Sequence, residues 1–256
     1  MIRDVVDLSQ LTAPGLVLDV AGGGEGMIGR ALGRQVVSID ISRSELEEAS
    51  NESLKLVMDA ADMSFLDNAF TDATCFFGMM YMPTQLRPRV LAEIFRVLAP
   101  GGCLRLWDAE IPPVAASGSA ENDVFMIELE VIIGAGERAR RHRTTYGVGL
   151  RDKAQSCCSV TRAAVDSGFM ALGHGGSDRT FHLSLLKPYD SDTRLAGQTP
   201  TGMGPMRIVR AAARDLQDAY EVLADSCRRV VNRGRSVPLW LFTSEGLQHV
   251  ADKIRD

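Results

Sequence analysis

The fold is decided by residues 17–26, which read Val17-Leu18-Asp19-Val20-Ala21-Gly22-Gly23-Gly24-Glu25-Gly26. An apolar run with one carboxylate leads into a cluster of glycines, and the helical pattern Met27–Leu32 follows at once. This order predicts a buried strand, a tight turn and a helix. Because glycine has no Cβ, the backbone of such a turn comes close to a ligand, and the free N–H groups of the helix start face it. We therefore predict a small-molecule site near residues 19–26.

The spacing of the glycines narrows the class of ligand. Residues 22–26 fit G-x-G-x-G but not the dinucleotide pattern G-x-G-x-x-G, since Met27 holds the last position. The chain also has no Gly-Lys-Ser/Thr loop that would cradle phosphates. Asp19 would repel a phosphate, whereas it would attract an ammonium group or accept hydrogen bonds. The segment alone leaves one alternative open, a plain turn that packs the helix on the strand.

Composition excludes several classes of protein. The chain has 256 residues, of which 45% are apolar and 24% charged, as in a globular protein with one large domain or one domain and an appendage. The net charge of -5 gives no basic field for nucleic acid, and no stretch approaches the roughly 20 apolar residues that cross a bilayer. The N-terminus lacks the apolar core of a signal peptide. We expect a cytoplasmic protein with no nucleic-acid or membrane partner.

The cysteines and histidines predict no special chemistry. The five cysteines form no Cys-x-x-Cys pair and are interpreted as reduced, mostly buried thiols, which suits the cytoplasm. The four histidines have no metal-ligand spacing, so no metal site is predicted. The adjacent Cys157 and Cys158 are expected in a helix, where they point to different faces and serve packing.

Apolar strand-like runs alternate with helical patterns over the first 110 residues. This alternation predicts an α/β fold with a doubly wound, mostly parallel sheet, which binds its ligand at the carboxyl ends of the strands. The candidate strands are 16–20, 35–40, 54–58, 73–77 and 102–108, and the candidate helices are 26–33, 42–50, 61–68 and 85–98.

The second half of the chain is less regular. We predict a loop over 111–120, a helix over 121–141, a helix over 152–167 and a hairpin with strands at 171–172 and 179–186. Further along, the pattern predicts a linker over 190–205, a long helix over 206–233, an apolar run over 237–242 and a last helix from Ser244.

Further carboxylates follow the second and third predicted strands. Asp40 is placed to bind a ribose diol, although it could instead cap the helix that follows it. Asp59 and the N–H of Ala60 are placed to read the edge of an adenine. The run from Phe76 to Met82 follows the fourth strand, and its methionines and aromatics either flank a flat ring or thioether or belong to the core.

Together these segments resemble the class I S-adenosylmethionine-dependent methyltransferases, of the type 11/25-like kind. Residues 17–26 are similar to the family's first motif V-L-D-x-G-x-G-x-G, with Ala21 where glycine is common, and residues 58–65 to G-D-A-E-D-L-P-F. Residues 93–102 are similar to E-x-x-R-V-L-K-P-G-G, a structural helix and turn. The resemblance covers residues 14–110 and, more weakly, 163–188. Asp72 lies one position after the family's usual aspartate, and Ser64 replaces a common proline.

The resemblance implies an enzyme with a Rossmann-like seven-stranded sheet, an antiparallel strand in its last hairpin, and S-adenosyl-L-methionine as cofactor. It assigns the methionine part of the cofactor to the glycine loop, the ribose to the acid after the second strand and the adenine to the Asp-Ala pair. The residues implied to bind the cofactor are Asp19, Ala21, Gly22, Gly24, Asp40, Ile41, Asp59, Ala60, Gly78 and Met79.

Methyl transfer by in-line displacement needs alignment and exclusion of water more than covalent help. A general base is required only when the acceptor is protonated. No residue is assigned as that base, and the candidates are Tyr81, Asp108, His142 and His174. A histidine in such a position is more often an ordinary surface or packing residue.

The acceptor is expected to be a small molecule. An RNA or protein methyltransferase, or a catalytically silent cofactor-binding protein of the same fold, is the alternative. The basic run Arg138–Arg143 either recognises an anionic acceptor or is a solvated helix end. We predict a cofactor domain over 1–189, with an acceptor-side insertion at 111–151, and a mainly helical extension over 190–256. We expect this extension to be a lid or a dimerisation element, the latter forming a homodimer through 205–256.

Overall fold

The computed structural model of the chain describes residues 4–113 and 124–189. Its seven-stranded sheet has the strand order β4-β3-β2-β5-β6-β10-β9. The strands β2 to β6 pair in parallel, whereas β10 runs antiparallel to both of its neighbours, β6 and β9. The predicted α/β sheet with an antiparallel strand in its last hairpin is therefore confirmed. The strands are β2 (Val17–Val20), β3 (Val36–Asp40), β4 (Leu54–Val57), β5 (Phe70–Phe76), β6 (Leu98–Ala109), β9 (Met170–Gly176) and β10 (Thr180–Leu186).

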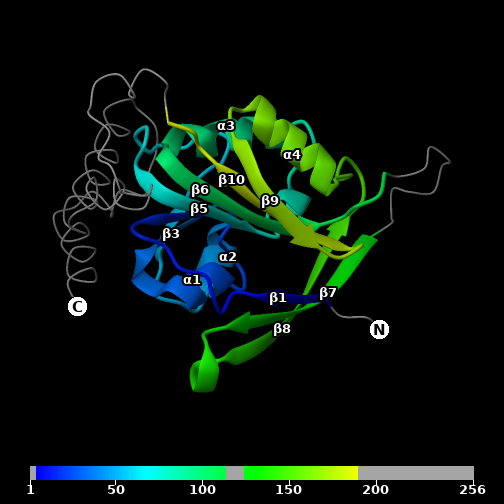
Figure 1. Ribbon diagram of the computed structural model, residues 1–256. Helices are drawn as coiled ribbons and strands as arrows, with labels where there is room; N and C mark the ends of the chain where they lie inside the picture. Colours follow the sequence, from blue (N-terminus) through cyan, green and yellow to red (C-terminus); the bar gives the residue numbers. More distant parts are fainter. Residues whose placement is uncertain (1–3, 114–123, 190–256) are drawn as a thin grey trace.

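Two apolar layers cover opposite faces of this sheet, and Figure 1 shows α3 and α4 on one side and α1 on the other. Neighbouring strand residues serve different layers, as Leu18 packs with α3 and α4 and Val17 with α1. Burial on both faces explains why the parallel strands read as continuous apolar runs. The helices are α1 (Met27–Leu32), α2 (Arg43–Glu48), α3 (Arg87–Val97) and α4 (Cys157–Asp166), with short 3-10 turns η1 (Gly33–Gln35), η2 (Met79–Tyr81) and η4 (Gly136–Arg138).

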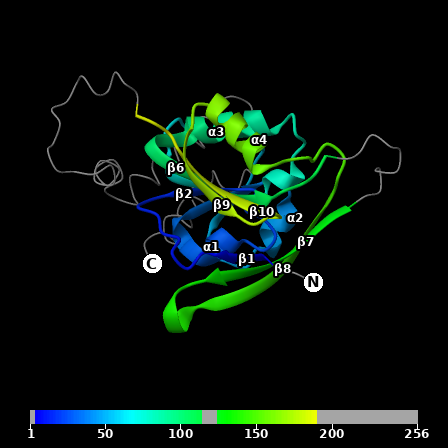
Figure 2. The ribbon, with the colours of Figure 1, turned by 45° about the vertical axis from the view of Figure 1, so that its right-hand side comes forward.

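A second, three-stranded sheet replaces the helix predicted over 121–141, and that prediction is wrong for the described residues. It contains β1 (Asp4–Asp7), β7 (Val124–Ile133) and β8 (Arg140–Gly149), with β1 parallel and β8 antiparallel to β7. In Figure 2, β7 and β8 form a long curved ribbon below α1. The buried positions of β7 recur every second residue, with Glu128 and Glu130 between them, which is the period of a strand. These buried residues are Ile127, Leu129, Val131 and Ile133.

Three smaller predictions also need correction. Residues 61–68 form turns where a short helix was predicted. The basic run at 138–143 lies on the short 3-10 turn η4 and on β8 and does not end an α-helix, and Arg141 and Arg143 both pair with Glu130 on β7. Of the cysteines expected to pack in the core, Cys158 is exposed. The helix predicted over 152–167 is confirmed as α4, which begins at the cap Ser156.

Several predictions lie outside the described residues, namely most of the loop over 111–120 and everything assigned to 190–256. In the described parts, no helix is long and apolar enough to cross a membrane. The same residues contain no cluster of three or more side chains able to hold a metal ion.

Candidate functional site

A cavity of about 800 Å³ lies at the carboxyl ends of β2, β3, β4 and β5. Its walls come from the glycine loop, from the segments after β3, β4 and β5, and from the helices α1 and α2. Residues 144–146 of β8 and the start of α3 also line the cavity, so the small sheet contributes to the same space. The position at the strand ends is where open α/β sheets bind their ligands, and the volume is typical of a small-molecule site.

Backbone hydrogen bonds fix the glycine loop between β2 and α1. The N–H of Gly22 donates to the carbonyl of Ile39 at 3.0 Å, and that of Gly24 to the carbonyl of Glu45 at 2.8 Å. A Cβ on Gly22 would lie 2.4 Å from a carboxylate oxygen of Asp19, and Gly24 has a φ of +58°, which larger residues adopt with strain. The loop therefore presents bare backbone to the cavity.

Asp19 lines the cavity from within β2 and is 1% exposed. Thr74 on β5 donates a hydrogen bond to its Oδ1 at 2.9 Å. Burial raises the pKa of Asp19 to about 7, against the effect of the Thr74 hydrogen bond, and the negative charge of Asp40 raises it further. A cationic group of a ligand placed beside Asp19 would favour the ionised carboxylate.

Asp40 ends β3 and borders the cavity. Its Oδ1 accepts the N–H of Ser42 at 2.8 Å and its Oδ2 accepts the N–H of Gly23 at 3.3 Å. The cap of α2 is Ser42, whose hydroxyl accepts the N–H of Glu45 at 3.4 Å. The alternative interpretation of Asp40 as the cap of the following helix is therefore wrong.

Asp59, Ala60 and Ile41 form a wall of the cavity beside the end of β4. Asp59 Oδ1 accepts the N–H of Ala61 at 2.8 Å, which closes a tight turn directly after the strand. Ile41 is 76% exposed, so a large apolar side chain stands open next to two carboxylates. An apolar surface bordered by hydrogen-bond acceptors suits a flat ring with hydrogen-bond donors beside it.

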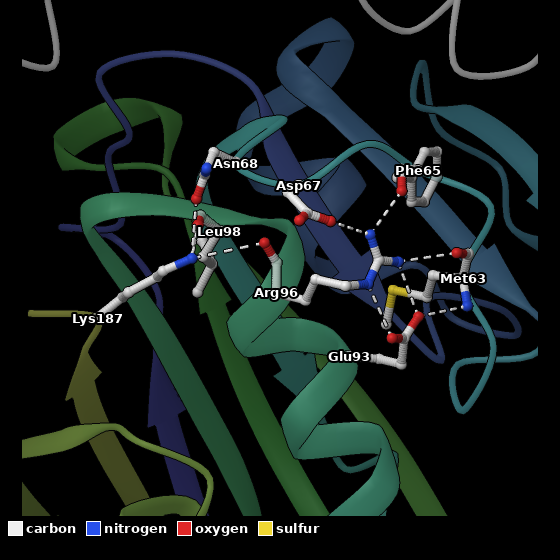
Figure 3. A network of polar contacts seen from close by, with 8 residues as sticks. All are labelled: Met63, Phe65, Asp67, Asn68, Glu93, Arg96, Leu98 and Lys187. Atoms are coloured by element: carbon white, nitrogen blue, oxygen red, sulfur yellow. Dashed lines mark hydrogen bonds and ion pairs between the residues drawn. The ribbon is translucent and has the colours of Figure 1, made fainter. Parts of the chain in front are cut away.

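A network of polar contacts fastens the loop between β4 and β5 to α3 (Figure 3). Arg96 donates to the carbonyls of Met63 at 2.9 Å and Phe65 at 2.8 Å, and it pairs with Glu93 and Asp67 at 2.8 Å each. Glu93 in turn accepts the N–H of Met63 at 2.8 Å. Charge-assisted bonds of this kind are stronger than neutral ones, and they give the Glu-x-x-Arg motif at 93–96 a structural role.

The small sheet contacts the glycine loop through a hydrogen bond and the residue after β5 through a pair of stacked rings. Thr144 Oγ1 on β8 donates to Glu25 Oε1 in the glycine loop at 2.8 Å. The ring of Tyr146 lies parallel to that of Phe77, with centroids 5.2 Å apart and planes 4° apart. Phe77 has a φ of +53° directly after β5, an unusual conformation for an aromatic residue. Strain at such a position is typical of functional sites.

Arg87 holds the segment that follows β5. It is 4% exposed and donates to the carbonyls of Met79 at 3.2 Å, Met82 at 3.1 Å, Lys153 at 3.0 Å and Ala154 at 2.8 Å. These bonds join the turn η2 to the segment that follows β8. Sequence reasoning missed this residue because its partners are backbone carbonyls, and two of them lie 66 and 67 residues away in the chain.

The structure brings together nine of the ten residues assigned to the cofactor. Met79 does not line the cavity, because it is fully buried in the core against α3. The nine that line the cavity are Asp19, Ala21, Gly22, Gly24, Asp40, Ile41, Asp59, Ala60 and Gly78.

Of the four candidate bases, only Tyr81 lines the cavity. His142 lies on β8 opposite Val131, and His174 lies on β9, outside the cavity lining. Asp108 is fully buried outside the lining, where it accepts bonds from the backbone and from Gln155. The roles proposed for His142, His174 and Asp108 therefore have no geometric support.

The charge of the cavity is one-sided. Among the described residues that line it, six are acidic and one, Arg30, is basic. Such a surface attracts a cation and disfavours a pyrophosphate. The acidic residues are Asp19, Glu25, Asp40, Glu45, Glu48 and Asp59.

Comparison with known proteins also indicates a methyltransferase domain. Residues 18–106 match the family described as "Methyltransferase domain". The chain is 35% identical to a demethylmenaquinone methyltransferase of Thermus thermophilus over 127 residues, which are 45% of this chain and 57% of that protein. It is 30% identical to a demethylmenaquinone methyltransferase of Listeria welshimeri over 156 residues, or 58% of this chain and 64% of the relative. The chain thus spans less than two thirds of the length of these relatives.

Among solved structures, an S-adenosylmethionine-dependent methyltransferase of Methanosarcina mazei superposes with a TM-score of 0.50 and 16% identity. The superposition covers 71% of this chain and 96% of that one, which supports the fold. Residues 18–106 therefore match a methyltransferase domain, and the strand order and the superposition agree in the fold.

Proposed function

We propose that this protein transfers a methyl group from S-adenosyl-L-methionine to a small-molecule acceptor by in-line displacement. The observation that carries the proposal is a set of three carboxylates that line one cavity at three neighbouring parallel strands: Asp19 lies within β2, Asp40 ends β3 and Asp59 follows β4. A donor with an ammonium group, a sulfonium and a ribose diol matches this set, because it brings two positive charges and no phosphate.

The glycine loop gives an independent test of fit. Side-chain atoms already occupy the places that Cβ atoms on Gly22 and Gly23 would need, as close as 2.4 and 2.5 Å. The loop is therefore built to leave its backbone bare on the cavity side, as close approach to a ligand requires. Bound there, the cofactor would supply an activated methyl group whose leaving group is an uncharged thioether.

In the proposed mechanism the residues of this chain bind and orient. Asp19 and the loop at 22–24 would hold the methionine part, Asp40 the ribose hydroxyls, and Asp59 with Ala60 the adenine. Ile41 would cover one face of the adenine ring. The wall from β8 would exclude water from the reacting atoms, so that positioning provides most of the rate.

The proposed acceptor is a small molecule with a flat apolar body. Phe76, Phe77, Tyr81 and Tyr146 line the cavity on the side of β5 and β8. The relatives from Thermus and Listeria are named as demethylmenaquinone methyltransferases, which supports a small-molecule acceptor. The acidic lining does not favour an RNA acceptor. Dimerisation through 205–256, a lid role for that region and a cytoplasmic location stay predictions.

Titration calorimetry with S-adenosylmethionine tests the cofactor. We expect binding by the wild type, and a loss of affinity of about tenfold to a hundredfold in Asp40→Ala, since a bond to a charged group contributes about 1.5–3 kcal/mol. Gly24→Ala should also weaken binding, whereas Gly33→Ala should not. Both glycines have a φ near +60°, but Gly33 has nothing within 4 Å of its added Cβ and lies outside the cavity. No binding at millimolar cofactor would refute the proposal.

A further inference from the structure

The side of the cavity that the cofactor residues leave unassigned lies between the glycine loop, β5 and β8. It is lined by Phe77, Tyr81, Tyr146 and Glu25. This wall combines aromatic rings with a single carboxylate, so its chemistry suits a planar aromatic molecule that carries a hydrogen-bond donor.

The two tyrosines on this wall are poor proton acceptors. Burial raises the pKa of Tyr81, and burial together with the negative charge of Glu25 raises the pKa of Tyr146 well above its ordinary range. Both phenols therefore stay protonated near neutral pH and serve as hydrogen-bond donors or ring surfaces. A proton that leaves the methyl acceptor must therefore be taken up by a group other than these two tyrosines.

Hydrogen bonds hold Glu25 in place at this wall. Thr144 is 7% exposed and donates to Glu25 Oε1 at 2.8 Å, and it is the one hydrogen-bond donor to this carboxylate among the described residues. The backbone carbonyl of Glu25 accepts a bond from Arg30 Nε at 2.8 Å, which fixes the main chain at the same place. The second carboxylate oxygen is thus left for a ligand in the cavity.

We propose that Glu25 is the catalytic residue that accepts the proton of a planar aromatic hydroxyl compound, and that Thr144 is its positioning residue. This inference rests on the proposed function. The hydroxyl proton moves to Glu25, and the electron pair of the broken O–H bond stays on the acceptor. A bond forms between the acceptor and the methyl carbon, the bond from that carbon to sulfur breaks, and the sulfur leaves as an uncharged thioether.

The test uses 4-nitrophenol as a probe, because its absorbance separates the neutral phenol from the phenolate without any turnover. In the wild type saturated with S-adenosylhomocysteine, the bound probe should titrate at a higher pH than free probe, since Glu25 disfavours a second negative charge. Glu25→Gln should lower the pKa of the bound probe by about one unit. Thr144→Val should give part of that shift, and Thr144→Ser, which keeps the hydroxyl, should restore the wild-type titration.

Glu47→Gln is the matched control, because it removes the same charge from the exposed surface of α2, where Glu47 pairs with Arg43 outside the cavity. Its probe titration should equal that of the wild type. An equal shift in Glu47→Gln, no shift in Glu25→Gln, or no binding of the probe would overturn the inference. Calorimetry with S-adenosylmethionine separates the two proposals, since a wild type that binds no cofactor refutes the proposed function itself.

Discussion

The buried carboxylate of Asp19 should make cofactor binding release protons. Its pKa is about 7 without ligand, because it is buried under the glycine loop. If the cofactor's ammonium binds the ionised form, binding at about pH 6 must first remove the proton from roughly nine tenths of the molecules, and at about pH 7 from roughly half. The dissociation constant should therefore fall about fivefold from pH 6 to pH 7.

Calorimetry in two buffers of different ionisation enthalpy measures this proton count directly. We expect about 0.9 proton released per cofactor near pH 6 and about 0.5 near pH 7 in the wild type. Asp19→Asn should bind more weakly and without the proton release. Asp72→Asn is the matched control, because burial also raises the pKa of Asp72, to about 6, while it lies outside the cavity and pairs with Arg105 at 3.5 Å.

Two results would refute this reasoning about Asp19. One is a wild type whose cofactor affinity and proton count do not change between pH 6 and pH 7. The other is an unchanged proton release in Asp19→Asn, which would assign the titrating group elsewhere. Loss of the release in Asp72→Asn would likewise show that a general effect on the fold was being measured.

Three further predictions concern stability, each measured by thermal or denaturant unfolding. The pKa of Asp19 in the folded protein lies above its ordinary value of 3.8, so ionisation of Asp19 should lower the free energy of unfolding as pH rises from about 4 to about 7, by up to about 4 kcal/mol. Asp19→Asn should flatten this decline. An unchanged dependence of stability on pH in Asp19→Asn would contradict the prediction. Gly78→Ala should lower the free energy of unfolding by about 1–3 kcal/mol, because the added Cβ would lie 2.6 Å from the Cβ of Ala21. The double variant with Ala21→Gly should recover part of this loss. Strict additivity of the two single effects on stability would count against the contact. Arg96→Ala should lower the free energy of unfolding by about 2–4 kcal/mol, because the loop carbonyls lose their hydrogen-bond donor. Arg89→Ala, on the exposed face of α3, should lower it by less than about 0.5 kcal/mol. Similar losses in the two variants would refute the role of the network.

The side of the cavity where we propose the cofactor could be predicted from the sequence because its signals are local. A parallel strand must be followed by a turn, and the residues of that turn are neighbours in the chain. Asp19, Asp40 and Asp59 each sit in or directly after such a strand, so their meeting at one edge of the sheet follows from the strand order. Met79 is the exception, because the short turn η2 directs it into the core.

The helix predicted over 121–141 shows where a local pattern was misinterpreted. The alternation of Ile127, Glu128, Leu129, Glu130 and Val131 has the two-residue period of a strand, and this signal was present in the sequence. The sequence does not show what stabilises that strand. β7 buries its apolar side against α1 and pairs with β1, which lies far earlier in the chain.

The sequence by itself determined the parallel sheet, the bare glycine loop and the carboxylates at the strand ends, because each depends on residues close together in the chain. The tertiary structure alone decided what faces them. Thr144 meets Glu25 across 119 residues, and Tyr146 stacks on Phe77 from another sheet. Contacts of this kind depend on how the two sheets pack, and the residue spacing within 17–26 carries no information about that packing. They define the side of the cavity where we propose that the acceptor binds.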